Sequence, residues 1–211
     1  MNIKQTHLPE KRELVSALVA ELCNQIKQFN FSEKEKKLWN ASLCSYAFYW
    51  DHYFKKAHDP ANLIGQDNFL KYLPREKVFV RFQEGDSLFD ILRIIAAVLT
   101  CYSCIEVSGE KQELVFLDSL KISNLILVKE SEEQFVLRLK KEKNSHIRLL
   151  KVPSVILKKS KFTFIQGEVL ANGRIELLNY LREVAISDDY HRYGNLGGRE
   201  NEARKSKNVK S

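Results

Sequence analysis

The sequence has no hydrophobic run long enough to cross a bilayer, a crossing that takes about 20 consecutive apolar residues. Its apolar runs are short, such as the one from Ile94 to Leu99. The first residues, MNIKQTHLPEKRE, have no apolar core of the kind that a signal peptide contains. We therefore expect a protein that neither spans a membrane nor is secreted, and we place it in the cytoplasm.

Cysteine is scarce, and the four cysteines do not form a reactive pattern. Cys23, Cys44, Cys101 and Cys104 lie in apolar segments, which suits a reducing compartment better than a disulfide framework. A redox CxxC needs its first cysteine at a helix N-terminus, but Cys101 follows a predicted helix and Cys104 begins a predicted strand. A zinc site would need a second CxxC or an HxxxH, which the sequence lacks. We expect buried structural thiols.

Glycine is missing where nucleotide binding would need it. The turn after the strand that ends at Phe82 reads Gln-Glu-Gly-Asp-Ser, with one glycine and two carboxylates that would repel a phosphate. The glycines of residues 194–198 neither follow a strand nor open a predicted helix, and the sequence has no P-loop. We therefore expect that this chain binds no cofactor.

The histidines have no nucleophile near them in the sequence. His58-Asp59 and Tyr190-His191 could act as acid–base pairs, and His52 and His146 stand apart from such residues. Each histidine is better explained as a capping or hydrogen-bonding residue. A small enzyme that uses His191 stays open as a third hypothesis.

The first 57 residues are predicted to form a helical hairpin or linker. Apolar residues from Leu14 to Ile26 repeat at helical spacing, and Ser32 with Glu35 forms a capping box that starts a second helix. This helix runs into an aromatic segment between Tyr46 and Phe54, which we expect to cover a core or a partner. Residues 58–76 are expected to be an irregular connector.

Repeated β-α-β patterns follow and indicate an α/β fold, with an open, mostly parallel, Rossmann-like sheet and helices on both of its faces. This domain is predicted to cover residues 77–196 and to include a final helix over about 174–184. Glu168 to Leu170 is predicted to be a strand, and Asn172-Gly173 a hairpin turn. Residues 197–211 are expected to be a disordered basic tail.

The net charge of +7 is concentrated in the C-terminal half. Between Leu137 and Lys161 there are nine Lys or Arg residues and one acid, Glu142. Such a surface can meet nucleic acid, an acidic protein or an anionic metabolite, or it can be an ordinary solvated face.

Two blocks carry a resemblance to a known family. One is residues 173–196, GRIELLNYLREVAISDDYHRYGNL; the other is residues 46–82, which end in HDPANLIGQDNFLKYLPREKVFVRF. They resemble the C-terminal region of bifunctional proline utilization A proteins, which fuse proline dehydrogenase to L-glutamate-γ-semialdehyde (Δ1-pyrroline-5-carboxylate) dehydrogenase. The resemblance covers roughly residues 10–196, and residues 10–57 are similar to the linker that leaves the dehydrogenase module.

The resemblance implies a non-catalytic, Rossmann-like domain related in fold to the aldehyde dehydrogenase superfamily. It also implies packing on the NAD-dependent dehydrogenase module, where the domain helps to close the substrate cavity. NAD and FAD are then expected in the partner modules, and a homo-oligomer is possible. The implied docking residues form one segment: Tyr190, His191, Arg192, Tyr193, Gly194 and Asn195.

This chain cannot supply either enzyme activity by itself. The catalytic cysteine of aldehyde dehydrogenases lies in a glycine-flanked loop, and none of the four cysteines has such surroundings. The barrel of proline dehydrogenase alone would take about 250 residues. The first hypothesis is therefore a docking domain of a proline-catabolic enzyme, without a nucleic acid partner; the alternative is a basic nucleic-acid-binding module.

Overall fold

Two N-terminal helices begin as the caps in the sequence predict. In this computed structural model, which describes residues 16–61, 66–142 and 146–189, α1 is Ala17–Gln25 and α2 is Glu33–Tyr49. The Ser32 hydroxyl accepts the Glu35 amide while the Glu35 carboxylate accepts the Ser32 amide, so the predicted capping box is confirmed. A short 3₁₀ turn η2, Ile26–Gln28, follows α1, and a π-helical turn η3, Trp50–Phe54, extends α2.

Five parallel strands form the central sheet, in the order β4-β3-β2-β5-β6. The sheet reverses its order between β2 and β5, as in other doubly wound folds. The α/β, parallel, Rossmann-like fold with a preceding helical segment is therefore confirmed. The strands are β2 Lys77–Arg81, β3 Cys104–Gly109, β4 Leu125–Lys129, β5 His146–Leu149 and β6 Thr163–Gln166.

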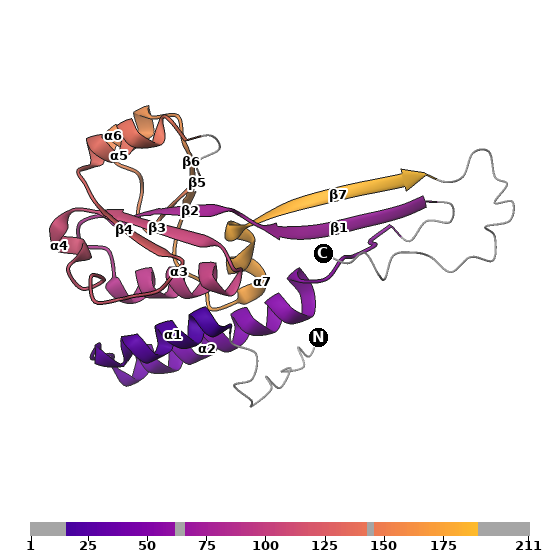
Figure 1. Cartoon of the computed structure of the whole chain (residues 1–211), viewed down its shortest axis with the longest axis horizontal. Coiled ribbons are helices and arrows are strands. Elements are labelled where there is room, and N and C mark those ends of the chain that lie inside the picture. Colours follow the sequence, from indigo (N-terminus) through magenta and orange to yellow (C-terminus); the bar gives the residue numbers. More distant parts are fainter. Residues whose placement is uncertain (1–15, 62–65, 143–145, 190–211) are drawn as a thin grey trace, which may run out of the picture.

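Helices cover both faces of this sheet. On one face α3 lies between the sheet and the pair α1 and α2 (Figure 1), and on the other face α5 and α6 pack against β2 and β5. Successive side chains of β2 point to opposite faces of the sheet. Val78 and Val80 therefore belong to the hydrophobic core under α3, while Phe79 belongs to the core under α5 and α6. The helices are α3 Leu88–Thr100, α4 Lys111–Leu114, α5 Glu132–Leu139 and α6 Val155–Lys159.

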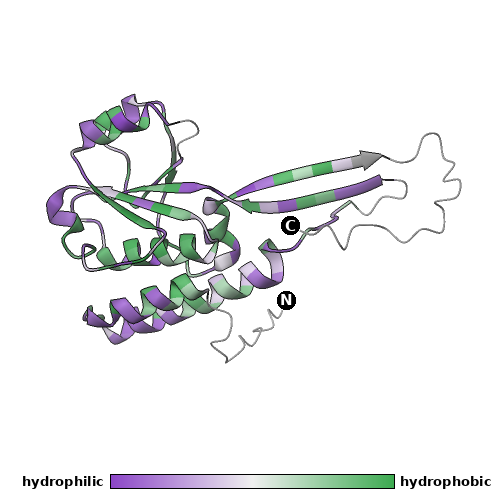
Figure 2. Ribbon diagram, viewed as in Figure 1, coloured by the Kyte–Doolittle hydropathy of each residue, from purple (hydrophilic) through white to green (hydrophobic). Residues whose placement is uncertain are grey.

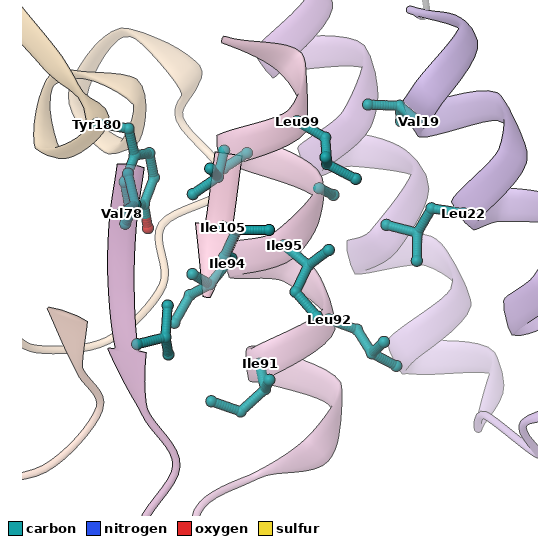
Figure 3. Close-up of a cluster of buried hydrophobic side chains, with 14 of the residues drawn as sticks. Val19, Leu22, Val78, Ile91, Leu92, Ile94, Ile95, Leu99, Ile105 and Tyr180 are labelled. Carbon is teal, nitrogen blue, oxygen red and sulfur yellow. The ribbon is translucent and has the colours of Figure 1, made fainter. Parts of the chain in front are cut away.

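The main core is centred on α3. Eleven of its thirteen residues are buried, because it is covered by strands on one side and by helices on the other. Figure 3 shows its aliphatic side chains between Val78 and Ile105 of the sheet and Val19 and Leu22 of α1. A helix that is hydrophobic all round is expected at such a position.

The predicted irregular connector at residues 58–76 is wrong in its second half. Residues Gln66–Pro74 form a strand, β1, which pairs antiparallel with β7, Leu181–Asp189. The two strands form a ribbon that projects from the body (Figure 1).

The predicted final helix over 174–184 is also wrong beyond residue 180. The helical part consists of α7, Gly173–Glu176, and the 3₁₀ turn η4, Leu177–Tyr180, and the chain then enters β7. Asn172 caps α7 instead of making a hairpin turn, because its side-chain oxygen accepts the amide of Arg174.

Two smaller corrections concern the segment between β5 and α7. Glu168 to Leu170 does not form the predicted strand. The Glu168 carbonyl accepts a hydrogen bond from the Arg148 side chain and not from a neighbouring strand. Helix α6 follows Pro153 where no helix is predicted, and Ser154 caps it. Within the described ranges, no helix is both long and apolar enough to cross a membrane.

Candidate docking surface

The β1–β7 ribbon projects from the body of the molecule (Figure 1). Nine pairs join it, from Gln66 opposite Asp189 to Pro74 opposite Leu181, which gives a length of about 30 Å. Its base is attached to the body by a hydrogen bond from the Arg75 amide to the Tyr180 carbonyl, 3.1 Å. The ribbon therefore stands on the junction between η4 and the start of β2.

One face of the ribbon is held by the aromatic end of the helical hairpin. The ring of Tyr72 lies 5.0 Å from Phe54 and 5.8 Å from Tyr53, centroid to centroid. His58 lies over Tyr53 at 4.4 Å, and its Nε2 donates to the Tyr53 carbonyl at 2.9 Å. Burial and a hydrogen bond with Tyr53 raise the pKa of Tyr72 to about 12, and the charge of Glu183 adds to this shift. The π-helical turn thus fixes the direction of the ribbon.

The opposite face of the ribbon mixes apolar side chains with the charged ones of Asp67, Lys71 and Arg182, and Asp67 is only 5% exposed. Side chains alternate along a strand, so Phe69 and Leu73 of β1 share this face with Val184 and Ile186 of β7. Leu73 is 39% exposed and Ile186 is 54% exposed. Figure 2 shows hydrophobic residues along both strands. We call Phe69, Leu73, Val184 and Ile186 the outer ribbon face.

Two further apolar side chains are exposed on the body, in the segment that leads into β7. Ile175 of α7 and Leu178 of η4, just before the base of β7, are about half exposed. In the part of the chain that the structure describes, the outer edge of β7 pairs with no further strand, whereas β1 makes a bridge from Leu70 to His58. An unpaired edge beside exposed apolar side chains is a surface on which another chain can add a strand.

A buried ion pair holds the base of this surface in place. Arg148 and Glu176 are each 1% exposed or less, and their side chains approach to 3.7 Å. The Tyr180 hydroxyl donates to Glu176 at 2.6 Å, and the Glu176 carboxylate also accepts the Leu170 amide at 2.9 Å. Burial and the negative charge of Glu176 raise the pKa of Tyr180 well above its usual value. Arg148, part of the predicted basic surface, is therefore an internal residue.

The docking segment implied by the resemblance, Tyr190, His191, Arg192, Tyr193, Gly194 and Asn195, lies outside the described residues, as does the predicted basic tail 197–211. In the sequence this segment follows directly on Asp189, the last residue of β7. The sequence did not indicate the ribbon or its outer face. The short apolar run Val184 to Ile186, with two β-branched residues, was the available signal.

The strand order reverses between β2 and β5, and a dinucleotide would bind beyond the carboxyl ends of these two strands. In this chain, side chains and backbone groups of the chain itself contact one another there. Lys151 donates to the Glu84 carbonyl at 2.9 Å, and its Nζ lies 3.6 Å from the Asp86 carboxylate. The other Asp86 oxygen accepts the Gln83 amide at 2.9 Å, while Ser87 caps α3. A pyrophosphate would meet carboxylates and engaged donors here, so the geometry does not favour a dinucleotide.

The remaining candidate groups have structural surroundings. Cys101 is buried at the end of α3, where burial raises the pKa of its thiol, whereas Cys104, the first residue of β3, is only partly buried; the prediction of buried thiols is thus confirmed for Cys101 and wrong for Cys104. His52 donates through Nδ1 to the Phe48 carbonyl at 2.9 Å. Over residues 16–61, 66–142 and 146–189, no group of three or more His, Cys, Asp or Glu residues is placed to hold a metal ion.

Comparison with solved structures finds this fold within a larger enzyme. The chain superposes on part of proline utilization A from Corynebacterium freiburgense with a TM-score of 0.54 and 21% identity, over 89% of this chain. It spans only 16% of the length of that protein. At this identity the likeness shows a shared fold and nothing finer.

Two aldehyde dehydrogenases are more distant. The NAD-dependent benzaldehyde dehydrogenase of Corynebacterium glutamicum has a TM-score of 0.42 and 10% identity, over 71% of this chain and 36% of its own. A betaine aldehyde dehydrogenase of Staphylococcus aureus gives 0.43 and 10% over the same shares. With TM-scores below 0.5 these two add no argument. No protein-family model matches the sequence, and the search of curated proteins gave no match.

Proposed function

We propose that this chain is a non-catalytic docking domain of a proline-catabolic enzyme of the proline utilization A type. In this proposal it packs on the L-glutamate-γ-semialdehyde dehydrogenase module and helps to close the substrate cavity of that module. The observation that carries the proposal is the β1–β7 ribbon, with exposed apolar side chains on its outer face and an edge of β7 that pairs with no other strand among the described residues.

Such a ribbon has a free-energy cost in water. A two-stranded ribbon by itself is marginally stable, and exposed apolar side chains along it favour association. Pairing of the free β7 edge with a strand of the dehydrogenase module would satisfy the open backbone groups. Burial of Phe69 and Ile186 in the same contact would remove these apolar side chains from water.

The segment that follows β7 extends this contact in the proposal. Tyr190, Arg192 and Tyr193 are of the residue types that anchor protein interfaces, because they combine apolar area with directed hydrogen bonds. NAD and FAD would be held by the partner modules, and this chain would bind neither. A homo-oligomer of the complex is compatible with this arrangement.

The proposal places the complex in the cytoplasm. All four cysteines are free thiols, and Cys101 is fully buried, as expected in a reducing compartment.

The test is binding to the dehydrogenase-module protein of the same genome, measured by calorimetry. We expect binding that Ile186→Glu weakens at least about tenfold, since the substitution puts a charge into an apolar contact. Deletion of residues 190–196 is expected to weaken it as well. The control is Val115→Glu, an exposed apolar residue beyond α4 and away from the ribbon, which should bind normally.

Two results would contradict the proposal. One is the absence of binding by the unmodified chain to that module. The other is equal loss of affinity in Ile186→Glu and Val115→Glu, which would show that the ribbon has no special part in the contact.

A further inference from the structure

A second exposed apolar surface lies on the far side of the sheet from α1 and α2. Helices α5 and α6 lie side by side there (Figure 1), and both carry hydrophobic and hydrophilic residues (Figure 2). Four aliphatic side chains point to solvent: Leu137 is 64% exposed, Val152 66%, Val155 65% and Ile156 37%. We call these residues, with the lysines named below, the α5–α6 surface.

The exposure of these side chains is not a result of loose packing. The inner sides of the helices are buried on the sheet through Phe135, Leu139 and Leu157. The N-terminal ends of α5 and α6 are joined by a hydrogen bond of 2.5 Å that the Ser154 hydroxyl donates to the Glu132 carboxylate. The outer side is therefore a rigid surface that the domain's own core does not use.

Free positive charge lies in and just after the same two helices. Arg138 and Lys151 lie in the same region but form ion pairs with Glu106, Glu130 and Asp86. By contrast, the side chains of five exposed lysines form no hydrogen bond or ion pair within the described part of the chain. They are Lys140 and Lys141 after α5, Lys158 and Lys159 in α6, and Lys161.

We infer that the α5–α6 surface binds an acidic amphipathic segment of a protein partner. Aliphatic side chains of the segment would pack on Leu137, Val155 and Ile156, and its carboxylates would meet the free lysines. Opposite charges beside apolar contacts would set the orientation of the segment, as in other complementary interfaces. This inference does not rest on the proposed docking through the ribbon, which leaves the body elsewhere.

The composition of the surface favours a protein over a nucleic acid. Nucleic-acid grooves pair positive charge with aromatic side chains on which bases stack. Here the large exposed side chains are aliphatic, and the neighbouring Phe162 and Phe164 are partly buried in the cluster under the helices. Phosphates would satisfy the lysines but would leave the aliphatic centre against a polar backbone.

The experiment measures fluorescence anisotropy of a labelled peptide with the full chain. The probe is a peptide of about 18 residues with leucines at helical spacing and glutamates beside them, since shorter helices are marginal in water. A scrambled peptide of the same composition is the reference. We expect binding of the helical pattern at least about tenfold tighter than of the scrambled one.

The variants separate the two parts of the surface. Leu137→Glu and Val155→Ser should each weaken binding several-fold, and Lys158→Glu with Lys159→Glu should weaken it and reduce its dependence on salt. The matched control is Lys34→Glu with Lys37→Glu on α2, the same change of charge on the other side of the molecule. All these positions are exposed, so unfolding midpoints should stay near that of the unmodified chain.

Three results would overturn the inference. Equal binding of the scrambled peptide would show that charge alone acts. Equal loss in the α2 control would show that the site is not local. Tighter binding of a DNA duplex of about 20 base pairs, or of vesicles that contain phosphatidylserine, would assign the surface to another class of partner.

Discussion

Gly173 allows α7 to approach α2 more closely than any other residue would permit. A Cβ at this position would lie 2.6 Å from the Ser45 carbonyl oxygen, and the Gly173 amide already donates to the Ser45 hydroxyl at 2.8 Å. Because the obstacle is backbone, it cannot turn away as a side chain can. The glycine therefore sets the distance between the helical layer and the base of the ribbon.

We predict that Gly173→Ala lowers the free energy of unfolding by about 1–3 kcal/mol, the usual cost of overpacking. Urea unfolding measures this change. The control is Gly109→Ala, whose new methyl group would meet side-chain atoms of Leu114 at 3.2–3.3 Å, which can move more easily than backbone. A loss at Gly109 as large as at Gly173 would contradict the argument from backbone contact.

The Arg148–Glu176 pair gives a second prediction at this scale. Arg148→Met should cost about 3–5 kcal/mol of stability, because it leaves the carboxylate of Glu176 buried without its charge partner. The double variant Arg148→Met with Glu176→Leu should recover part of the loss, since no unpaired charge then remains. Thermal unfolding of the two variants compares them, and an equal stability of both would refute this account.

Interactions between residues close in the sequence could be predicted, whereas the burial of Arg148 could not. The Ser32–Glu35 capping box was predicted because both of its partners lie within four residues. Arg148 reads as one more charge in a basic segment, since the carboxylate that pairs with it is 28 positions away. Burial of a charge depends on such distant partners, and the sequence does not display them.

At the scale of elements, the strands of the ribbon show how tertiary pairing overrides local preference. Leu177 to Val184 has good helix formers, and a helix was predicted there. The chain instead leaves the helix at Tyr180, because Leu181–Asp189 pairs along its whole length with Gln66–Pro74. Neither strand has an intrinsic reason to form without the other, so both were missed together.

We predict that Tyr72→Ala releases the ribbon from the helical hairpin while the body stays folded. The substitution removes the ring that packs against Tyr53 and Phe54. Hydrogen exchange should then become faster in β1 and β7 and remain slow in α3. Lys71→Ala is the control, because this residue lies on the opposite face of β1, and its exchange pattern should match that of the unmodified chain.

At the scale of the whole molecule, the fold class was predictable because strands and helices alternate along most of the chain. The strand order and the projecting ribbon were not, since they depend on which distant segments meet. The docking segment that the resemblance implies, residues 190–195, lies outside the described residues and stays a prediction. The outer ribbon face, by contrast, becomes visible only when β1 and β7 are side by side.

The stability of the whole chain should fall at alkaline pH. The pKa of Tyr72 is raised to about 12, and that of Tyr180 is raised well above its usual value of about 10, so both stay protonated in the folded state. Above pH 10 the unfolded chain loses these protons first, and unfolding becomes more favourable as the pH approaches 12. Urea unfolding at several pH values measures the slope.

Tyr72→Phe is the matched control for this titration. The variant should show a smaller alkaline loss than the unmodified chain, because phenylalanine has no proton to release. An unchanged slope in both Tyr72→Phe and Tyr180→Phe would assign the loss to other groups.

The register of the ribbon also has a mechanical consequence. Gln66 and Asp189 are paired at its tip, with the body attached at the other end. A force that pulls these two residues apart loads the hydrogen bonds one after another, as in opening a zipper. The ribbon should therefore peel from its tip towards Pro74 at low force before the parallel sheet bears any load.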